Sequence, residues 1–356
     1  MRANFWRGRR VWITGHTGFK GAWLALLLHH LGAEVHGYAL EPPTEPSLFE
    51  QAGIASAIED VRADICDRDA LDRALEAARP GIVFHLAAQS LVRASYEDPL
   101  ETVRTNVLGT ACVLEAARHR PEIEAVVVVT SDKCYENREW VWGYRENDPL
   151  GGHDPYSASK GCAELVTAAW RRSFCAETRP AIASARAGNV IGGGDWARDR
   201  LLPDCIRAFR RAEPVRLRRP EASRPWQHVL DPLAGYLVLA EALCGDAARF
   251  AGAWNFGPEE GEVRRVRDVV ERAAKLWGDG ARWTAEPEAT GPHEAHALQL
   301  SCARARALLG WKPRLGFEEA LAWTIDWYRR HARGESARRL TLEQIERFVA
   351  RSPREP

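Results

Sequence analysis

Short runs of apolar and β-branched residues alternate with longer segments of helical periodicity along the first half of the chain. The runs predict strands at 10–14, 34–40, 82–86, 125–129 and 181–186. The periodic segments between them predict helices over 19–31, 67–78, 100–118 and 154–177. Strands that alternate with helices are typical of a parallel, doubly wound sheet. The run Ala-Val-Val-Val-Val at 125–129 lacks polar alternation, which predicts a central strand covered on both faces.

The pattern changes after Gly192, where arginine, proline and tryptophan become dense and helices such as 231–243 and 317–330 are separated by longer loops. We therefore expect an α/β fold of the Rossmann type, with a smaller, mostly α substrate domain at the C-terminal end. The expected division is a dinucleotide-binding domain over 1–190, a substrate domain over 191–335 with an interleaved boundary, and a peripheral helix and tail over 336–356.

Composition narrows the function classes. The chain has 356 residues, 46% of them apolar, and a formal net charge of zero, so neither nucleic acid nor a membrane is an expected partner. No signal-peptide core precedes the first strand, and the longest apolar run, 23–31, is too short to cross a bilayer. These features predict a cytoplasmic protein. The eight cysteines have no metal-ligand spacing, which predicts reduced, packed thiols and no metal.

The basic residues are nearly all arginine. Lysine occurs only at Lys20, Lys133, Lys160, Lys275 and Lys312. Arginine does not give up its proton in proteins, whereas lysine can. A lysine in such a chain is therefore a candidate for proton transfer.

A glycine motif follows the first strand and opens the first helix. Gly15, Gly18 and Gly21 are spaced Gly-x-x-Gly-x-x-Gly. Glycines let the backbone approach a pyrophosphate, and the helix N-terminus offers free N–H groups. An ordinary glycine-rich turn is the alternative. The residues expected against a dinucleotide are Gly15, His16, Thr17, Gly18, Phe19 and Lys20.

Two further motifs carry acid/base side chains. Tyr156 and Lys160 lie four residues apart on a predicted helix, where an ammonium could lower the pKa of the phenol and make it a general base. Ser131, Asp132 and Lys133 directly follow the strand at 125–129, at the sheet edge where ligands of doubly wound folds bind. A solvated helix face and a simple turn are the respective alternatives.

Taken together, these motifs resemble those of the extended short-chain dehydrogenases/reductases that act on nucleotide sugars. The segments 15–21, 130–135, 137–146 and 224–229 are similar to the CDP-glucose 4,6-dehydratases in particular, and the resemblance extends to about residue 335. It implies a lyase that converts CDP-D-glucose to CDP-4-dehydro-6-deoxy-D-glucose by oxidation at carbon 4, elimination of water across carbons 5 and 6, and reduction at carbon 6. It also implies a role in deoxysugar or O-antigen biosynthesis and a homodimer or homotetramer.

The resemblance assigns roles to the catalytic residues. Tyr156 would take the proton of the 4-hydroxyl, Ser131 would hydrogen-bond that oxygen, and Lys160 would hold the nicotinamide ribose. Asp132 would protonate the hydroxyl that leaves carbon 6. Lys133 occupies the place of a glutamate base in the dTDP-glucose dehydratases. It is either the base at carbon 5, which requires a neutral amine that the charge of Lys160 would favour, or an electrostatic aid.

The resemblance also implies ligand contacts. Asp64 and Ile65 would meet the adenine of the dinucleotide, and the turn after the strand at 82–86 would line it with Leu86, Ala87, Ala88 and Gln89. NAD is favoured over NADP because no arginine awaits a 2′-phosphate after the second strand, where Glu41 stands just beyond Leu40. The residues implied for the nucleotide sugar are Ser90, Arg93, Asn189, Arg200, Leu201, Arg224 and His293.

Other functions use related sites. A nucleotide-sugar 4-epimerase would share Tyr156 and Lys160 but would not need Asp132 and Lys133. A dehydratase for another nucleotide-hexose would need all four. A non-catalytic, dinucleotide-sensing regulator on the same fold usually lacks the tyrosine and lysine pair.

Overall fold

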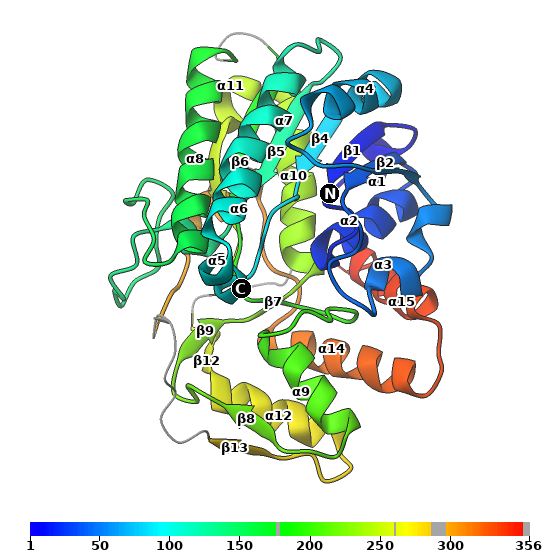
Figure 1. Ribbon diagram of the computed structural model, residues 1–356, viewed down its shortest axis with the longest axis vertical. Helices are drawn as coiled ribbons and strands as arrows, with labels where there is room; N and C mark the ends of the chain where they lie inside the picture. The colour runs from blue at the N-terminus through cyan, green and yellow to red at the C-terminus, as the bar shows by residue number, and fades with distance from the viewer. Residues whose placement is uncertain (176–178, 260, 286–296, 352–356) are drawn as a thin grey trace.

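Seven parallel strands form one sheet in the computed structural model, which describes residues 1–175, 179–259, 261–285 and 297–351 (Figure 1). The order is β11-β6-β5-β4-β1-β2-β3, so the chain starts in the middle and winds outward in both directions. The bounds are β1 (Arg10–Thr14), β2 (Glu34–Ala39), β3 (Glu59–Arg62), β4 (Ile82–His85), β5 (Ala125–Val129), β6 (Ala181–Arg186) and β11 (Gly252–Asn255). The predicted doubly wound fold is confirmed.

Strand β5 shows why both faces of the sheet are apolar. All five of its residues are buried. Val127 and Val129 belong to the core cluster on one face, and Val126 and Val128 belong to the cluster on the other. Successive side chains of a strand point to opposite faces, so an uninterrupted valine run serves two cores at once.

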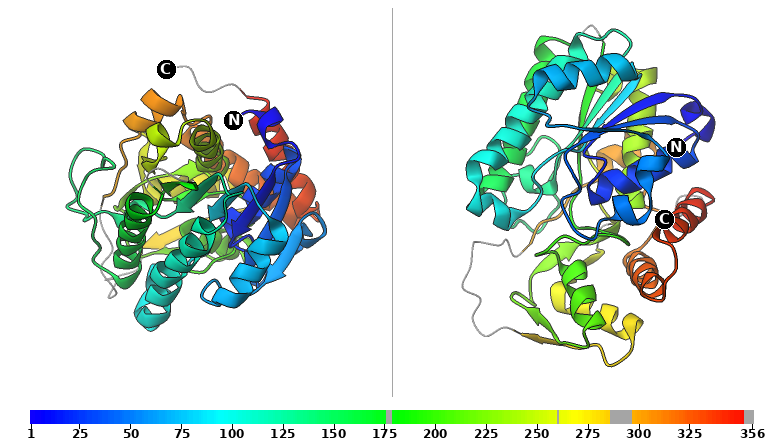
Figure 2. Two further views of the ribbon diagram at one scale, coloured as in Figure 1. Left: turned by 90° about the horizontal axis from the view of Figure 1, so that it is seen from above. Right: turned by 45° about the vertical axis from the view of Figure 1, so that its right-hand side comes forward.

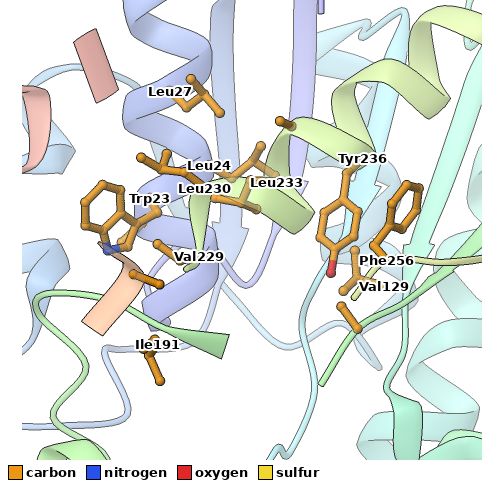
Figure 3. Packing of buried hydrophobic residues seen from close by; sticks show 14 of the residues in the cluster. Trp23, Leu24, Leu27, Val129, Ile191, Val229, Leu230, Leu233, Tyr236 and Phe256 are labelled. Atoms are coloured by element: carbon orange, nitrogen blue, oxygen red, sulfur yellow. The ribbon is translucent and has the colours of Figure 1, made fainter. Parts of the chain in front are cut away.

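Helices cover the two faces as separate layers. Helices α2 (Phe19–His30) and α10 (Leu230–Gly245) pack on one face, where Figure 3 shows Leu24 and Leu27 of α2 near Leu230 and Leu233 of α10. The other face carries α4 (Arg68–Ala78), α7 (Gly109–Arg118) and α8 (Pro155–Ser173). Helix α7 continues α6 (Pro99–Val103) through a π-helical turn, η2 (Arg104–Leu108), so the predicted helix over 100–118 is confirmed with a π-helical middle.

A smaller lobe lies beyond the carboxyl ends of the strands (Figure 2). It contains α9 (Leu201–Arg210), α12 (Val266–Trp277) and two strand pairs, β8 (Val215–Leu217) with β13 (Trp283–Ala285) and β9 (Ser223–Pro225) with β12 (Val263–Arg265). A third pair, β7 (Val190–Ile191) with β10 (Gln227–His228), joins this lobe to the sheet-containing part. Helix α14 (Phe317–Ala332) packs on α12.

The chain returns to the first part after visiting the smaller lobe, as β11 and α10 show. The predicted domain limits stay a prediction. Helix α15 (Ala337–Val349) packs on α2 and buries Leu340, Ile345 and Phe348 in the main core, because its apolar stripe faces that helix. The short elements are α1 (Ala3–Trp6), α3 (Leu48–Gln51), η1 (Ile54–Ser56), α5 (Val92–Glu97), η3 (Asp132–Cys134), α11 (Ala247–Phe250) and α13 (Ala303–Leu309).

Within the described residues, no helix combines the length and apolar character that a membrane crossing requires. All eight cysteines are free thiols. Across the same residues, no group of three or more His, Cys, Asp or Glu side chains could hold a metal ion.

Candidate active site

A cleft of about 870 Å³ lies between the carboxyl ends of the strands and the smaller lobe. The segments that follow β1, β2, β4, β5 and β6 line it from the sheet side, and residues of α9, β8 and β9 line it from the lobe. This is where the strand order reverses between β1 and β4, which is the usual ligand site of doubly wound sheets.

The glycine turn has the geometry that a pyrophosphate requires. Gly15 has φ of +75°, and a methyl group there would lie 2.7 Å from the backbone nitrogen of Ala87. A methyl group at Gly21 would lie 2.1 Å from the Gly15 carbonyl oxygen. At Gly18 the methyl group would meet only that oxygen, at 3.5 Å. Gly18 thus leaves space toward the cleft at the N-terminus of α2, which has no side-chain cap. These residues fit a dinucleotide phosphate.

Two residues of the motif behave differently from their glycine neighbours. The His16 side chain is buried outside the cleft lining and pairs its Nε2 with Asp60 Oδ1 at 2.7 Å, so only its backbone could meet a cofactor. Lys20 lines the cleft and reaches the Tyr236 hydroxyl at 3.5 Å. Burial, followed by the charges of Arg200 and Lys160, lowers the pKa of Lys20 to about 7.

The residues expected to meet an adenine are Asp64 and Ile65. Both line the cleft. The Asp64 carboxylate already has partners, since it accepts from the Cys66 backbone at 2.8 Å and pairs with Arg104 at 2.6 Å. Arg104 is a residue that sequence reasoning missed, because it lies 40 positions further along the chain.

Leu86, Ala87, Ala88 and Gln89 line the cleft after β4, as expected. The Thr14 hydroxyl accepts from the backbone nitrogens of Leu86 and Ala87 at 3.1 and 3.0 Å. Asn106, within the π-helical turn, accepts from the Gln89 backbone at 2.9 Å and donates to Ser159 at 2.8 Å. Sequence reasoning missed Asn106, which ties this loop to α8.

The expectation that no arginine stands near the end of the second strand is wrong. Arg62 stands beside the end of β2, because β3 pairs with β2 and sets Arg62 opposite Ala39. Its guanidinium donates to the Leu40 carbonyl at 3.3 Å and to Glu41 at 3.2 Å. Strand pairing, rather than nearness in sequence, brings this arginine to the site.

The segment after β5 places the predicted acid/base set in the cleft. Ser131, Asp132 and Lys133 all line it. The Ser131 hydroxyl accepts from the Lys133 backbone at 3.2 Å and donates to Asp132 at 3.0 Å, which fixes the turn at η3. Asp132 is almost fully buried, and a methyl group at Gly188 would lie 1.8 Å from its carboxylate. Gly188, which we did not predict, therefore makes room for Asp132.

Tyr156 and Lys160 lie one turn apart near the start of α8, and both line the cleft. Tyr156 and Ser131 line the same cleft, and the Ser131 hydroxyl lies near enough to act on the pKa of the phenol, so the two motifs meet in space. The expected lowering of the tyrosine pKa is corrected: burial raises the pKa of Tyr156 to about 12, and the Ser131 hydroxyl offsets this only in part. Burial lowers the pKa of Lys160 to about 8, against the opposing charges of Cys134 and Glu164.

A buried ion pair supports this corner and was missed by sequence reasoning. Glu164 lies one turn beyond Lys160 and pairs with Arg186 at 2.7 Å, with both side chains 3% exposed. Glu164 also accepts from Thr130, directly before Ser131, and from Ser184 at 2.7 Å. The pair therefore links α8, β5 and β6 beneath the catalytic residues.

The predicted substrate arginines Arg93 and Arg200 already hold carboxylates. Arg200 pairs with Asp195 at 3.0 Å and donates to Ser90 at 3.0 Å. Arg93 pairs with Asp199 at 3.3 Å. The remaining predicted substrate residues are placed as follows: Leu201 begins α9, Arg224 lies on β9, Asn189 approaches Asp132 at 3.5 Å, and all three line the cleft, whereas His293 lies outside the described residues.

Comparison with known proteins identifies the family. The family model described as GDP-mannose 4,6 dehydratase matches residues 12–324, and the chain belongs to that family. It is 50% identical to the CDP-glucose 4,6-dehydratase of Salmonella typhimurium, over 99% of each chain. It is 30% identical to the dTDP-glucose 4,6-dehydratase of Streptomyces antibioticus, over 89% of this chain and 91% of the relative.

Among solved structures, the chain is similar to the UDP-glucose 4-epimerase of Thermus thermophilus in complex with NAD. The TM-score is 0.78 with 26% identity, and the match covers 90% of this chain and 99% of the epimerase. The fold is therefore shared by dehydratases and epimerases, and the side chains in the cleft must separate the two activities.

Proposed function

We propose that this member of the GDP-mannose 4,6-dehydratase family is an NAD-dependent CDP-glucose 4,6-dehydratase. The observation that carries the proposal is the meeting of two chemical pairs in one cleft. Ser131 and Tyr156 line the cleft together, as an oxidation site requires, and Asp132 and Lys133 follow Ser131 in the same turn, as an elimination requires. An epimerase uses only the first pair. The high identity to the Salmonella enzyme supports CDP-glucose as the substrate.

NAD would take a hydride from carbon 4 of the sugar and return it to carbon 6. The chain offers the turn from Gly15 to Gly21 for the pyrophosphate, Asp64 and Ile65 for the adenine, and the loop Leu86 to Gln89 along the dinucleotide. The NAD in the similar Thermus epimerase structure supports this choice of cofactor.

Each proton transfer of the proposed reaction is assigned to one residue of the chain. Tyr156 accepts the proton of the 4-hydroxyl while Ser131 hydrogen-bonds the same oxygen. The ketone at carbon 4 makes the proton on carbon 5 acidic, and Lys133 removes it. Asp132 protonates the hydroxyl that leaves carbon 6. Its burial beside Ser131 keeps this carboxyl out of bulk water.

The direct test incubates the protein with NAD and CDP-glucose and measures a 4-keto product by its absorbance in alkali. A parallel series with dTDP-, GDP- and UDP-glucose ranks the nucleotides by kcat/KM. We expect the CDP sugar to lead. A product that is the 4-epimer of the substrate would favour an epimerase, and binding without turnover would favour a dinucleotide-sensing regulator.

Single-turnover experiments on two variants distinguish the proposed roles of Lys133 and Asp132. Lys133→Ala should oxidise carbon 4 and then stall, so that nicotinamide absorbance builds up and solvent deuterium exchange at carbon 5 is lost. Asp132→Asn should stall as well but keep exchanging carbon 5, because only the leaving hydroxyl lacks its acid. Exchange at the wild-type rate in Lys133→Ala would reduce Lys133 to an electrostatic aid.

The cellular setting is part of the same proposal. The product fits deoxysugar and O-antigen biosynthesis in the cytoplasm, where nucleotide sugars are made. A homodimer or homotetramer is supported by apolar side chains that α6, η2 and α8 leave exposed side by side, among them Leu100, Leu108 and Leu165. Light scattering at working concentrations measures the assembly, and a monomer would contradict it.

A further inference from the structure

Lys20 is a charged side chain that the glycine turn does not need, because backbone N–H groups are enough to meet a phosphate there. It lies in the first turn of α2 and lines the cleft. Its Nζ reaches the Tyr236 hydroxyl at 3.5 Å and stands 5.9 Å from the centre of that ring. Tyr236 is fully buried on α10, and Figure 3 shows its hydroxyl beside Val129, the last residue of β5. The lysine therefore extends from α2 toward the turn after β5.

The surroundings of Lys20 favour a cation poorly. Among the described residues, Arg200 and Lys160 act on it as like charges, and Asp132 is the carboxylate that acts in the opposite sense. The N-terminus of α2 adds a partial positive charge. Burial, followed by the charges of Arg200 and Lys160, lowers the pKa of Lys20 to about 7. A lysine in such a place costs the folded chain free energy, which points to a function for its charge.

The same neighbours show at which end of the cleft the Lys20 ammonium lies. Lys160 stands on α8 and Asp132 in the turn after β5, where the proposed hydride and proton transfers take place. Asp64, which is assigned to the adenine, follows β3 at the far edge of the sheet. The Lys20 ammonium thus belongs to the nicotinamide end of the proposed dinucleotide site, and the inference below rests on that site.

We propose that Lys20 sets the balance between the oxidised and the reduced dinucleotide in the cleft, and that Tyr236 holds its ammonium in place. The nicotinamide ring carries a positive charge when it is oxidised and is neutral when it is reduced. A nearby ammonium repels the oxidised ring, so it favours hydride transfer from carbon 4 of the sugar. The hydride must then stay on the dinucleotide while water leaves carbon 6, and the same charge favours that state.

Binding alone tests this role, with no nucleotide sugar present, so the outcome does not depend on the sugar chemistry. Isothermal titration calorimetry gives the Kd of NAD, NADH and ADP-ribose for each protein. ADP-ribose carries the pyrophosphate and both riboses but no nicotinamide. NAD and NADH have identical phosphates, so a lysine that only bound phosphate would change all three Kd values alike. A lysine that acts on the ring changes the ratio of the Kd for NAD to the Kd for NADH.

The variants are Lys20→Met, which keeps a long side chain without the charge, and Tyr236→Phe, which removes the hydroxyl that Nζ reaches. Thermal unfolding checks that each is folded. In Lys20→Met at about pH 6 we expect the ratio of the Kd for NAD to the Kd for NADH to fall about tenfold, the effect of one unit charge at short range. Tyr236→Phe should lower the ratio by a smaller factor. ADP-ribose should bind both variants within about threefold of wild type.

The wild-type ratio should also depend on pH. Below its pKa Lys20 is protonated and favours NADH, and this preference should be lost as pH rises and the ammonium gives up its proton. The other groups that face Lys20 are Lys160, Asp132, Tyr236 and Arg200. Their contributions remain in Lys20→Met, so the difference between this variant and wild type isolates Lys20.

Lys275→Met is the matched control. It removes an exposed lysine of α12 that is not part of the cleft lining, and it should leave all three Kd values unchanged. A ratio in Lys20→Met equal to that of wild type would overturn the inference. Equal weakening of NAD, NADH and ADP-ribose would overturn it as well, because Lys20 would then be a phosphate ligand. If none of the three binds wild type, the proposed dinucleotide site itself is wrong.

Discussion

The two walls of the cleft differ in the groups that they present: one presents mainly backbone, and the other presents charged side chains. The cofactor wall, residues 15–21 and 86–89, presents mainly backbone to the cleft, and Gly15 and Gly21 are required there because a side chain would make contacts of 2.1 to 2.9 Å. The substrate wall presents long side chains to the cleft, namely Arg93, Arg200, Arg218 and Arg224. The first wall is shaped by packing and the second by charge.

The two walls also differ in what holds their groups in place: packing in the cofactor wall and ion pairs in the substrate wall. Packing fixes the backbone of the cofactor wall in advance, so its donors are ordered when the dinucleotide binds. The arginines of the substrate wall are partly neutralised, because Asp195 holds Arg200 and Asp199 holds both Arg93 and Arg218. A diphosphate that bound these arginines would have to compete with the carboxylates.

The largest expected effect comes from removing the proposed general base, Tyr156. Tyr156→Phe keeps the ring in its buried place and removes the hydroxyl proposed to act as the general base. We expect kcat to fall about 10²–10⁴-fold, the usual worth of general-base assistance, while both walls still bind their ligands. Stopped-flow rates and CDP binding measure the two quantities. Turnover within threefold of wild type would assign the proton to another group.

The pH dependence of the oxidation step tests whether the pKa of Tyr156 is raised during catalysis. Because burial raises the pKa of Tyr156 to about 12, the phenolate fraction grows as pH rises and is small at neutral pH. The single-turnover oxidation rate at carbon 4 should then increase by about tenfold per pH unit between pH 6 and 9. A plateau near pH 7 would show that a bound ligand supplies the missing positive charge.

Arg224→Ala probes the substrate wall. A charge-assisted hydrogen bond to a phosphate is worth about 1.5–3 kcal/mol, so CDP should bind roughly ten- to a hundredfold more weakly. The rate of hydride transfer from bound substrate should change less, and NAD binding should not change. Unaltered affinity for CDP would remove Arg224 from the phosphate site.

Gly21→Ala probes the cofactor wall in the same way. The added methyl group would meet the Gly15 carbonyl at 2.1 Å, and such overpacking costs about 1–3 kcal/mol of unfolding free energy. NAD should bind more weakly, whereas CDP should bind as before. Gly245→Ala, at the end of α10 with nothing within 4 Å of its new methyl group, is the control and should not destabilise the protein. Equal urea midpoints for the two variants would refute the tight contact.

The smallest effect should come from Asp199→Asn, which removes the competing carboxylate from Arg93 and Arg218. Asp199 has φ of +59°, a conformation that asparagine tolerates. We expect CDP to bind up to about threefold more tightly at low salt, since partly exposed pairs are worth at most about 1 kcal/mol. The gain should vanish at high salt. Weaker binding would mean that Asp199 positions the arginines and does not compete for them.

The sequence by itself determined the features that depend on local spacing. The glycine turn, the one-turn separation of Tyr156 and Lys160, and the buried valine strand all follow from periods of the chain, because helices and strands repeat at fixed intervals. The fold class, the order of most elements and some of the residues that line the cleft, among them Ser131 and Tyr156, could therefore be predicted.

Tertiary structure decided what depends on partners from distant segments. Strand pairing carries Arg62 to Glu41, and packing sets Gly188 under Asp132 and the Glu164–Arg186 pair beneath the catalytic turn. It also reversed the expected pKa direction of Tyr156, since burial raises the pKa of the phenol and the Ser131 hydroxyl and the charge of Arg200 offset this only in part. Spacing fixes which residues share a face of an element, but only the packed chain fixes which charges meet and how much water remains between them.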